Sequence, residues 1–383
     1  MAKRTNGEGS IRKRSDGRWE GRYFDIGLQK QRSVYGKTQK EVREKLKEKS
    51  SDRDAGIDWS KGAVTVEQWL TTWIKTYNIN IKPLTYDSYI GIIKNHINPA
   101  IGHISLQNLC TQNIQDMYNN MINADYGKGL SVKTLRNVHG VVHKAMEQAM
   151  NLGYIKRNPA EACVLPKYYK KEIVPMDSEL AKAFVKRIKE DDFADIFFVT
   201  LFTGVRQGEI LGLKWDCIDF DKGIIIIKRQ LQKRKQKGAS YYLAPTKNGK
   251  DRYIVPAPIV MDVLRRVKEK QIKAKRVAGN LWNTESQWNG LVFTNEFGRY
   301  LVPGTIYKHY KKIVKKMEED YLRFHDLRHS FAVISLENGD DIKTIQETLG
   351  HYSAAFTMDT YSHVTNLMQR RSADRMQNYI TSI

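Results

Sequence analysis

The stretch of residues 325–363 constrains this chain most, because it brings reactive side chains together on short helices. It contains the motifs HDLRH, LGH and TYSH, in that order. His325 and Arg328 are three residues apart, so a helix presents both side chains on one face. The glycine of LGH predicts a helix C-cap, which places His351 just beyond a helix end and Tyr361 on the next short helix.

These side chains suit chemistry on a phosphate. The planar fork of an arginine matches two phosphate oxygens, and a histidine exchanges protons near neutral pH. A tyrosine hydroxyl can attack the phosphorus atom. On its own, however, a His-x-x-Arg pair on a helix is more often a surface pair than a site. Both interpretations therefore stay open at this point.

The motifs resemble the C-terminal signature of a known family, the tyrosine recombinases of the phage-integrase superfamily. HDLRHSFA, LGH and TYSH carry this resemblance, and TGVRQGE at residues 203–209 is similar to the TGxRxxE box of the family. PTK at residues 245–247, followed by RYIVP, resembles the segment that holds the β-hairpin lysine of the family. Four boxes in the order of the family, across half of the chain, make the resemblance specific.

The resemblance implies a site-specific recombinase that cuts and rejoins duplex DNA, integrating and excising a mobile element. The catalytic residues that it implies are Arg206, Lys247, His325, Arg328, His351 and Tyr361. Tyr361 would attack the scissile phosphate, which forms a 3′-phosphotyrosyl bond and frees a 5′-hydroxyl. Because the covalent bond stores the energy of the cleaved one, no ATP is needed. No metal and no other cofactor is implied.

The arginines and histidines have distinct roles within this resemblance. Arg206 and Arg328 would hold the non-bridging phosphate oxygens and stabilise the pentavalent state. His325 would act as a base or a hydrogen-bond donor, and His351 would support the phosphate. Glu209, three residues after Arg206, is expected to hold the guanidinium in place, although a purely structural Arg–Glu pair is the alternative.

The lysine of the site is expected to protonate the leaving oxygen as a general acid. The Asn-Gly pair that follows Lys247 predicts a two-residue hairpin turn, which places this lysine at a hairpin tip. Lys250 is the rival residue. The five-residue step from Lys247 to Arg252 fits the family better, so Lys247 is preferred.

The charge of the chain favours a nucleic-acid partner. Its 383 residues include 64 Lys and Arg against 42 Asp and Glu, a net charge of +22, which suits duplex DNA. An anionic membrane surface is the competing partner, but no apolar run approaches the ~18 residues of a spanning helix. The N-terminus does not resemble a secretion signal, and the three cysteines lack metal-ligand spacing. These features predict a cytoplasmic protein with reduced cysteines.

Three domains are predicted, with an α+β fold overall. Residues 1–50 are expected to form three strands and a helix, with a turn at SDG and a helix cap at Thr38. This module resembles the AP2-like arm-binding domains of phage and conjugative-transposon integrases, which implies binding to separate arm sites. A solvated β-hairpin appendage is the alternative. The candidate DNA contacts are Arg12, Arg14, Arg18 and Arg22.

Residues 63–160 are predicted to form an all-α domain. Apolar stripes predict four helices: Thr65 is expected to cap the first, the second follows Pro83, Thr111 is expected to cap the third, and Ser131 opens the fourth. The second helix is expected to end at Pro99, and the aromatic residues of the stripes are expected in the core. By position this segment is similar to the SAM-like core-binding domain of the family. Its candidate DNA contacts are Lys133 and Arg136.

Residues 174–383 are predicted to form a mostly α catalytic domain with small antiparallel sheets and a C-terminal tail. The four isoleucines at 224–227 predict a strand that is buried on both sides. Exchange between two duplexes needs four cuts, and one Tyr361 makes one cut, so a homotetramer on DNA is implied. The tail either packs within its own domain or, as the resemblance suggests, docks on a neighbouring protomer.

Two other functions share part of these features. A non-catalytic DNA-binding regulator could keep the same scaffold, but none of the implied catalytic residues is missing. A type IB topoisomerase shares the chemistry, whereas the arm module and the TGVRQGE and LGH boxes favour a recombinase. The accessory partners to look for are an excisionase and a host DNA-bending protein.

Overall fold

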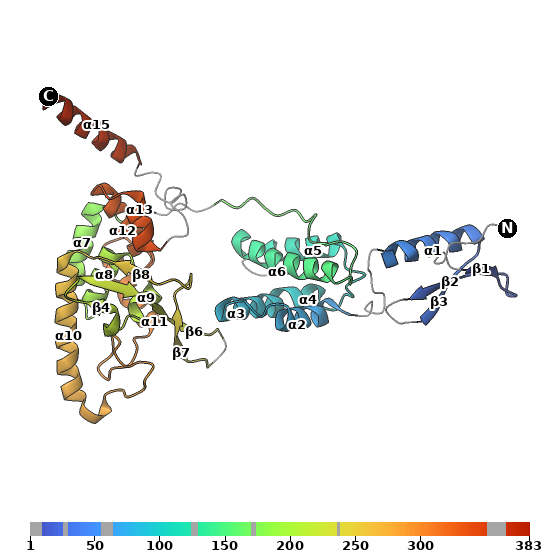
Figure 1. The fold of residues 1–383 in the computed structure, drawn as a ribbon, viewed down its shortest axis with the longest axis horizontal. Coiled ribbons are helices and arrows are strands. Elements are labelled where there is room, and N and C mark those ends of the chain that lie inside the picture. Colours follow the sequence, from blue (N-terminus) through green and yellow to red (C-terminus); the bar gives the residue numbers. More distant parts are fainter. Residues whose placement is uncertain are drawn as a thin grey trace. The chain divides into compact units, whose positions relative to one another are not determined.

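The computed structural model divides the chain into two compact units. The first holds residues 1–170 and 234–237, and the second holds residues 171–233 and 238–383. The structure describes residues 10–25, 30–54, 64–123, 129–169, 174–235, 238–350 and 365–383. As predicted, the fold is α+β, with helices and small antiparallel sheets (Figure 1). None of the helices in the described ranges is both long and apolar enough to span a bilayer.

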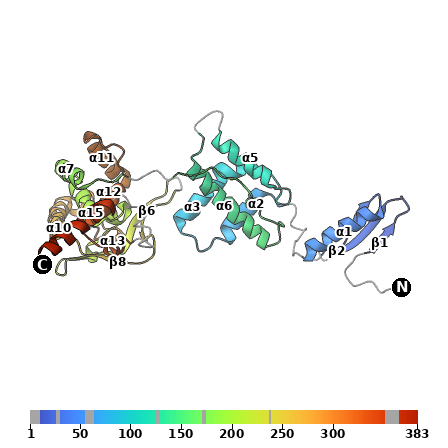
Figure 2. The same ribbon diagram turned by 90° about the horizontal axis from the view of Figure 1, so that it is seen from above.

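The N-terminal segment of the first unit is a three-stranded sheet with one helix. Its elements are β1 (Ser10–Lys13), β2 (Trp19–Asp25), β3 (Lys30–Gly36) and α1 (Gln39–Asp54). The sheet is antiparallel in the order β1-β2-β3, and α1 lies along it (Figure 2). Gly21 makes this packing close, because a Cβ there would lie 2.6 Å from Val42. Glu20, the preceding residue of β2, therefore points to the face opposite α1.

The all-α part of the first unit has an aromatic core. Its helices are α2 (Val66–Thr76), α3 (Pro83–Ile92), α4 (Asn98–Ile101), α5 (Thr111–Ile122) and α6 (Val132–Asn151), with a π-helical stretch at Ile93–Ile97. Trp69 and Trp73 are buried, and Trp69 donates a hydrogen bond from Nε1 to the Ala145 carbonyl (2.9 Å). The prediction that the aromatic stripes form a core is confirmed for Trp69, Trp73 and Tyr118, whereas Tyr77 at the end of α2 is 43% exposed.

Two helix boundaries in this part differ from the prediction. Cys110, rather than Thr111, is the N-cap of α5, and its backbone N–H donates to Asn113 Oδ1 (3.1 Å). Pro99 does not end a helix but lies in the first turn of α4. Proline is tolerated in a first turn, because the N–H that it lacks has no partner within the helix there.

The second unit contains two small sheets among helices (Figure 1). Its strands are β4 (Ile218–Asp219), β5 (Ile224–Ile227), β6 (Arg229–Lys233), β7 (Tyr241–Pro245) and β8 (Arg252–Ile254), paired as β4-β5-β8 and β6-β7. Its helices are α7 (Ser178–Ile188), α8 (Ala194–Thr203), α9 (Gln207–Leu211), α10 (Pro258–Ala278), α11 (Pro303–Lys316), α12 (Asp326–Glu337), α13 (Ile342–Leu349) and α15 (Thr365–Thr381). Short 3-10 turns lie at Trp215–Cys217 and Gly279–Leu281.

Two clusters of apolar side chains hold the helices that carry the site. The ring centroids of neighbouring aromatic residues lie 5.6–6.4 Å apart among Phe184, Phe197, Tyr310 and Phe324. A smaller cluster joins α12 to α13 through Val333, Leu336, Ile345 and Leu349. Because these side chains are buried, α8, α12 and α13 form a fixed frame.

Strand β5 differs from the prediction of a strand buried on both sides. Ile225 and Ile227 are buried, whereas Ile224 and Ile226 are only half-buried. The strand does lie in the middle of its sheet, between β4 and β8. The face of Ile224 and Ile226 is only partly covered, so the run of isoleucines reflects a central strand rather than a fully covered one.

Candidate active site

Arg206 lies at the start of α9, directly after a tight turn. Gly204 ends α8 in the left-handed conformation (φ 63°), as predicted. A Cβ at Gly204 would lie 2.5 Å from Leu349 and 2.7 Å from Phe331, so only glycine fits between these side chains. The turn therefore brings the TGVRQGE box against α12 and α13, with Arg206 as the N-cap of α9.

Glu209 holds Arg206, as predicted from their spacing. The carboxylate is fully buried. It accepts hydrogen bonds from Arg206 Nη1 (2.7 Å) and from the Arg206 backbone N–H (2.9 Å). Burial by itself would raise the pKa of Glu209, but the hydrogen bond and charge of Arg252, and then the charge of Arg206, lower it to about 2. The carboxylate is therefore ionised at neutral pH.

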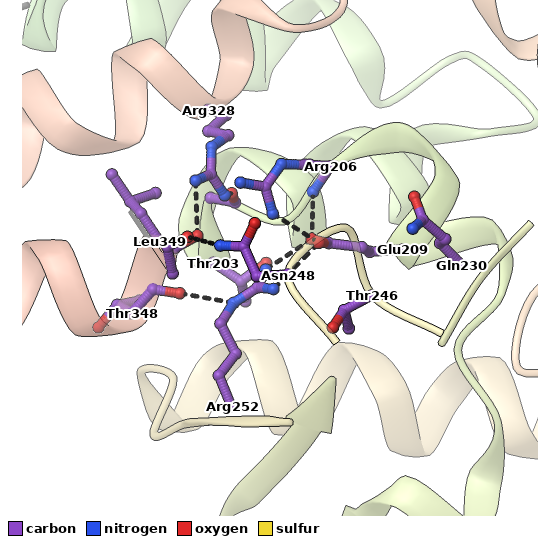
Figure 3. Close-up of polar contacts among 12 residues, drawn as sticks. Thr203, Arg206, Glu209, Gln230, Thr246, Asn248, Arg252, Arg328, Thr348 and Leu349 are labelled. Carbon is purple, nitrogen blue, oxygen red and sulfur yellow. Dashed lines mark hydrogen bonds and ion pairs between the residues drawn. The ribbon is translucent and has the colours of Figure 1, made fainter. Parts of the chain in front are cut away.

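Arg328 is buried on α12, which excludes an exposed surface pair. Its Nη1 donates to the Gly204 carbonyl (2.8 Å), and its Nη2 donates to the Leu349 carbonyl (2.5 Å). These carbonyls lie at the ends of α8 and α13, where helices leave acceptors unpaired. Figure 3 shows the Arg328 guanidinium with its bond to Leu349, and Arg206 with its bonds to Glu209.

His325 is the N-cap of α12 and keeps an exposed surface. Its ring lies 5.1 Å from the ring of His329, at a right angle to it. The surrounding protein partly desolvates it, and this effect, followed by the charges of Arg328 and Arg206, lowers the pKa of His325 to about 4. The imidazole is therefore neutral at neutral pH and able to accept a proton.

Lys247 lies in a turn, as predicted, but the turn does not close a hairpin. The Gly249 N–H donates to the Thr246 carbonyl (2.9 Å), and Gly249 has a φ of 69°. Strand β7 before the turn pairs with β6, and strand β8 after it pairs with β5. The hairpin prediction was wrong, because an Asn-Gly pair fixes a turn but not the partners of the flanking strands.

A hollow of about 610 Å³ lies beside this turn, and Arg206, Lys250 and Gly350 are among its lining residues. Asn248 donates from Nδ2 to the Gly350 carbonyl (3.3 Å), so the turn contacts the end of α13. Lys247 and Lys250 are both exposed. Because Lys250 lines the hollow, it stays a rival of Lys247 for the role of general acid.

His351 and Tyr361 lie outside the described residues. Helix α13 ends at Leu349, and Gly350 is its C-cap in the left-handed conformation (φ 64°), as predicted. The described chain resumes at Thr365. The roles of the histidine and the tyrosine therefore stay predictions.

Two family models match this chain. The model of the phage integrase family matches residues 176–368, which is half of the chain, and the model of the N-terminal SAM-like domain of phage integrases matches residues 65–122. The chain belongs to the phage integrase family. It is a tyrosine recombinase, an enzyme that cuts and rejoins DNA.

Relatives of this phage integrase match it along most of its length. A protein named tyrosine recombinase XerC-like, from Caldanaerobacter subterraneus subsp. tengcongensis, is 29% identical over 349 residues, which is 87% of this chain and 88% of the relative. The ICEBs1 integrase of Bacillus subtilis is 24% identical over 328 residues, which is 83% of this chain and 84% of the relative.

Solved structures share the fold of this integrase. The Tn1549 transposon integrase in complex with a circular intermediate DNA has a TM-score of 0.67 at 20% identity, covering 82% of this chain and 99% of the other. A lambda integrase tetramer bound to a Holliday junction has a TM-score of 0.53 at 19% identity, covering 90% of this chain and 96% of the other. These likenesses show the fold.

Arg252 belongs to the site of this integrase, although sequence reasoning assigned it no role. It donates to both oxygens of Glu209 (3.0 and 2.5 Å) and from Nε to the Thr348 carbonyl (2.9 Å). The only signal in the sequence was its fixed step from Lys247. That step marks the segment but does not reveal its partners.

The predicted DNA contacts of the N-terminal module lie in two pairs. Arg12 and Arg22 donate to Glu20 at 2.6 and 3.3 Å. The guanidinium carbons of Arg14 and Arg18 lie 5.4 and 5.9 Å from the centre of the Tyr35 ring, which suits a cation–π contact. The structure thus orders Arg12 and Arg22 on the sheet, and Arg14 and Arg18 at the turn between β1 and β2.

The predicted contacts of the all-α part lie on α6. Lys133 and Arg136 are both exposed in its first turns. Arg136 donates from Nη2 to the Pro166 carbonyl (2.9 Å), which orders its side chain. Within the described residues no group of three or more His, Cys, Asp and Glu side chains is arranged to hold a metal ion.

Proposed function

We propose that this tyrosine recombinase cuts one DNA strand at a time by attack of the Tyr361 hydroxyl on the scissile phosphate. The Tyr361 oxygen forms a bond to phosphorus, and the bond from phosphorus to the 5′ oxygen breaks. The products are a 3′-phosphotyrosyl linkage and a 5′-hydroxyl. Because the linkage stores the bond energy, the 5′-hydroxyl of another strand can reverse the step without ATP.

The observation that carries this proposal is the pair of hydrogen bonds made by Arg328. It donates to Gly204 at 2.8 Å and to Leu349 at 2.5 Å. The HDLRH box thus touches the TGVRQGE box and the end of the LGH helix. Boxes that are far apart in the sequence supply one basic site, which is what binding a phosphate requires.

The remaining residues take the roles that the family resemblance implies. Arg206 and Arg328 would hold the non-bridging oxygens, and each such donor is worth about 10²–10³ in rate. His325, neutral by its lowered pKa, would take the tyrosine proton or donate a hydrogen bond. His351 would support the phosphate, and Lys247 would protonate the 5′ oxygen as it leaves.

DNA binding would be divided among three domains, at residues 1–50, 63–160 and 174–383. The first would bind arm-type sites through Arg12, Arg14, Arg18 and Arg22. The second would bind core-type sites with Lys133 and Arg136, and the third would carry the chemistry. The ordered arginines of the sheet and the net charge of +22 support this division.

Assembly would be a homotetramer on two synapsed duplexes, acting in the cytosol on a mobile element. Four cuts need four copies of Tyr361. Helix α15 exposes Met376, Tyr379 and Ile380, which supports docking of the tail on a neighbouring protomer. An excisionase or a host DNA-bending protein would act as an accessory partner.

The decisive experiment uses a nicked suicide duplex that carries the joined ends of the element encoding this chain. Full-length protein should form a covalent adduct, and Tyr361→Phe should bind the duplex but form none, because only the attacking oxygen is missing. An adduct from Tyr361→Phe would refute the assignment and turn attention to Tyr352 and Tyr379. Strand exchange between two site-bearing duplexes separates a recombinase from a type IB topoisomerase.

Assembly is tested by deletion. Removing residues 366–383 should abolish recombination and loosen synaptic complexes, while one protomer still binds a half-site. Removing residues 1–50 should be milder at the crossover site but should eliminate binding to arm DNA. Gel shifts and a two-plasmid exchange assay score both variants. Normal exchange by the tail deletion would mean that the protomers are coupled through another surface.

A further inference from the structure

Arg252 connects two parts of the site. It begins β8, and its side chain is only 10% exposed. Two of its nitrogens donate to Glu209, at 3.0 and 2.5 Å, and the third donates to the Thr348 carbonyl at 2.9 Å. Figure 3 shows the Arg252 guanidinium between Thr348 and Glu209. One side chain therefore links β8 to α9 and to the end of α13.

The two arginines bind Glu209 in different ways. Arg252 uses both terminal nitrogens, whereas Arg206 uses Nη1 and its backbone N–H. A bidentate pair fixes the plane of a carboxylate, so Arg252 sets the orientation of Glu209. Glu209 in turn sets the position of the Arg206 guanidinium. Arg252 thus affects the position of the phosphate-binding Arg206 only indirectly, through the fully buried carboxylate of Glu209.

Loss of Arg252 would change what Arg206 does. A buried carboxylate needs compensating charge, and Glu209 has no exposed surface. Without Arg252, both Glu209 oxygens would have Arg206 as their main cation. The guanidinium of Arg206 would then be drawn toward Glu209 and away from a phosphate.

The third bond of Arg252 supports the end of α13. The Thr348 carbonyl is one of the acceptors that a helix C-terminus leaves unpaired. Gly350 leaves room for this contact, because a Cβ there would lie 3.0 Å from Arg252 Cδ. Arg252 therefore also supports the residue from which the chain continues toward His351.

We propose that Arg252 is a positioning residue of the recombinase. It acts chiefly on Arg206 through Glu209, while its bond to Thr348 supports the end of α13. It does not bind the phosphate, because all three of its guanidinium nitrogens already donate to Glu209 and Thr348. The inference rests on the proposed function, since it requires Arg206 to bind the scissile phosphate.

The test measures single-turnover adduct formation by full-length protein at saturating concentration on the nicked suicide duplex. Arg252→Lys keeps the charge but loses the fork. We expect the rate to fall about 10–100-fold, as for other residues that orient a functional group. Half-site binding by gel shift and the thermal midpoint should stay close to wild type. Arg265→Met, which removes an exposed α10 arginine paired with Asp262, is the control and should cleave at the wild-type rate.

A double variant separates positioning from a general loss of structure. If Arg252 acts through Arg206, then Arg206→Lys combined with Arg252→Lys should be within ~3-fold of Arg206→Lys alone. Full multiplication of the two effects would overturn the inference. So would wild-type cleavage by Arg252→Lys, or a loss of cleavage that follows a loss of folding or half-site binding. Tyr361→Phe, run in parallel, tests the proposed function separately, because an adduct from that variant refutes it whatever Arg252 does.

Discussion

Glu20 in the N-terminal sheet and Glu209 in the catalytic unit are both covered carboxylates between two arginines. Glu20 accepts hydrogen bonds from Ser33 (2.7 Å), Arg12 (2.6 Å) and Arg22 (3.3 Å). The bond from Ser33, followed by that from Arg12, lowers the pKa of Glu20 to about 2. The pKa of Glu209 is also about 2, although burial opposes its ionisation.

The two sites differ in how far their arginines are exposed. The side chains of Arg12 and Arg22 are 58% and 41% exposed, whereas those of Arg206 and Arg252 are 23% and 10% exposed. Glu20 is covered by its own partners on a thin sheet, and Glu209 is covered by a core. An exposed pair suits contact with an extended surface such as a DNA groove, and a buried pair suits one small group that enters a site. Under the proposed function, the same ion pairing orders arginines for two purposes.

The largest effect is expected from removing the buried charge. Glu209→Gln leaves Arg206 and Arg252 beside each other without a counter-charge, and breaking a buried pair costs about 3–5 kcal/mol of unfolding free energy. We also expect adduct formation to fall by ~10²-fold or more. Calorimetry and the suicide duplex measure the two losses. Glu20→Gln, the matched change on the open sheet, should leave adduct formation unchanged and should cost less stability, because the arginines beside it are more exposed; equal losses of stability in both variants would break the comparison.

A smaller loss, confined to chemistry, is expected from Arg206→Lys. Lysine keeps the charge but loses the fork that matches a phosphate. The rate of cleavage should fall by about 10²-fold, while DNA binding and the thermal midpoint change little. A variant that still cleaves at the normal rate would mean that Arg206 serves only as a structural partner of Glu209.

An effect of about tenfold is expected at the open sheet. Glu20→Gln removes the charge that orders Arg12 and Arg22, so arm DNA should bind about tenfold more weakly, a typical loss for one contact with DNA. Gel shifts on arm DNA and on the crossover site should show a change in the first only. Glu41→Gln is the control, because Glu41 pairs with Lys45 on the helix of the same module. Unchanged arm binding by Glu20→Gln would separate these arginines from DNA recognition.

The smallest effect concerns pH. Each carboxylate contributes stability that is complete above pH 4.5 and is lost as the pH falls toward 2. His329 differs, because burial, followed by the charge of His325, lowers its pKa from 6.5 to about 4. Its contribution is complete above pH 6.5 and is lost as the pH falls toward 4. The thermal midpoint should therefore decline between pH 6.5 and 5, and His329→Gln should reduce that decline; an unchanged slope would assign it to other groups.

Short residue spacings in the sequence predicted much of the site, but they did not predict hydrogen bonds between residues that are far apart in the sequence. The pairing of Arg206 with Glu209 and the glycine ends of α8 and α13 follow from spacings of a few residues, which sequence reveals directly. The bonds of Arg328 to Gly204 and of Arg252 to Glu209 span 124 and 43 residues. No periodicity encodes such distances. For the same reason the Asn-Gly turn was predicted, whereas the different sheets of its flanking strands were not.

The large sequence separation between Arg328 and its hydrogen-bond partners also affects the order in which the parts of this protein become functional during synthesis. Its partner Gly204 leaves the ribosome 124 residues earlier, and its partner Leu349 leaves it 21 residues later. Domains generally fold in order from the N-terminus as the chain emerges. Under the proposed division of DNA binding, the nascent protein would hold DNA before it could cut it, because Arg328 gains both of its carbonyl partners only after Leu349 has emerged.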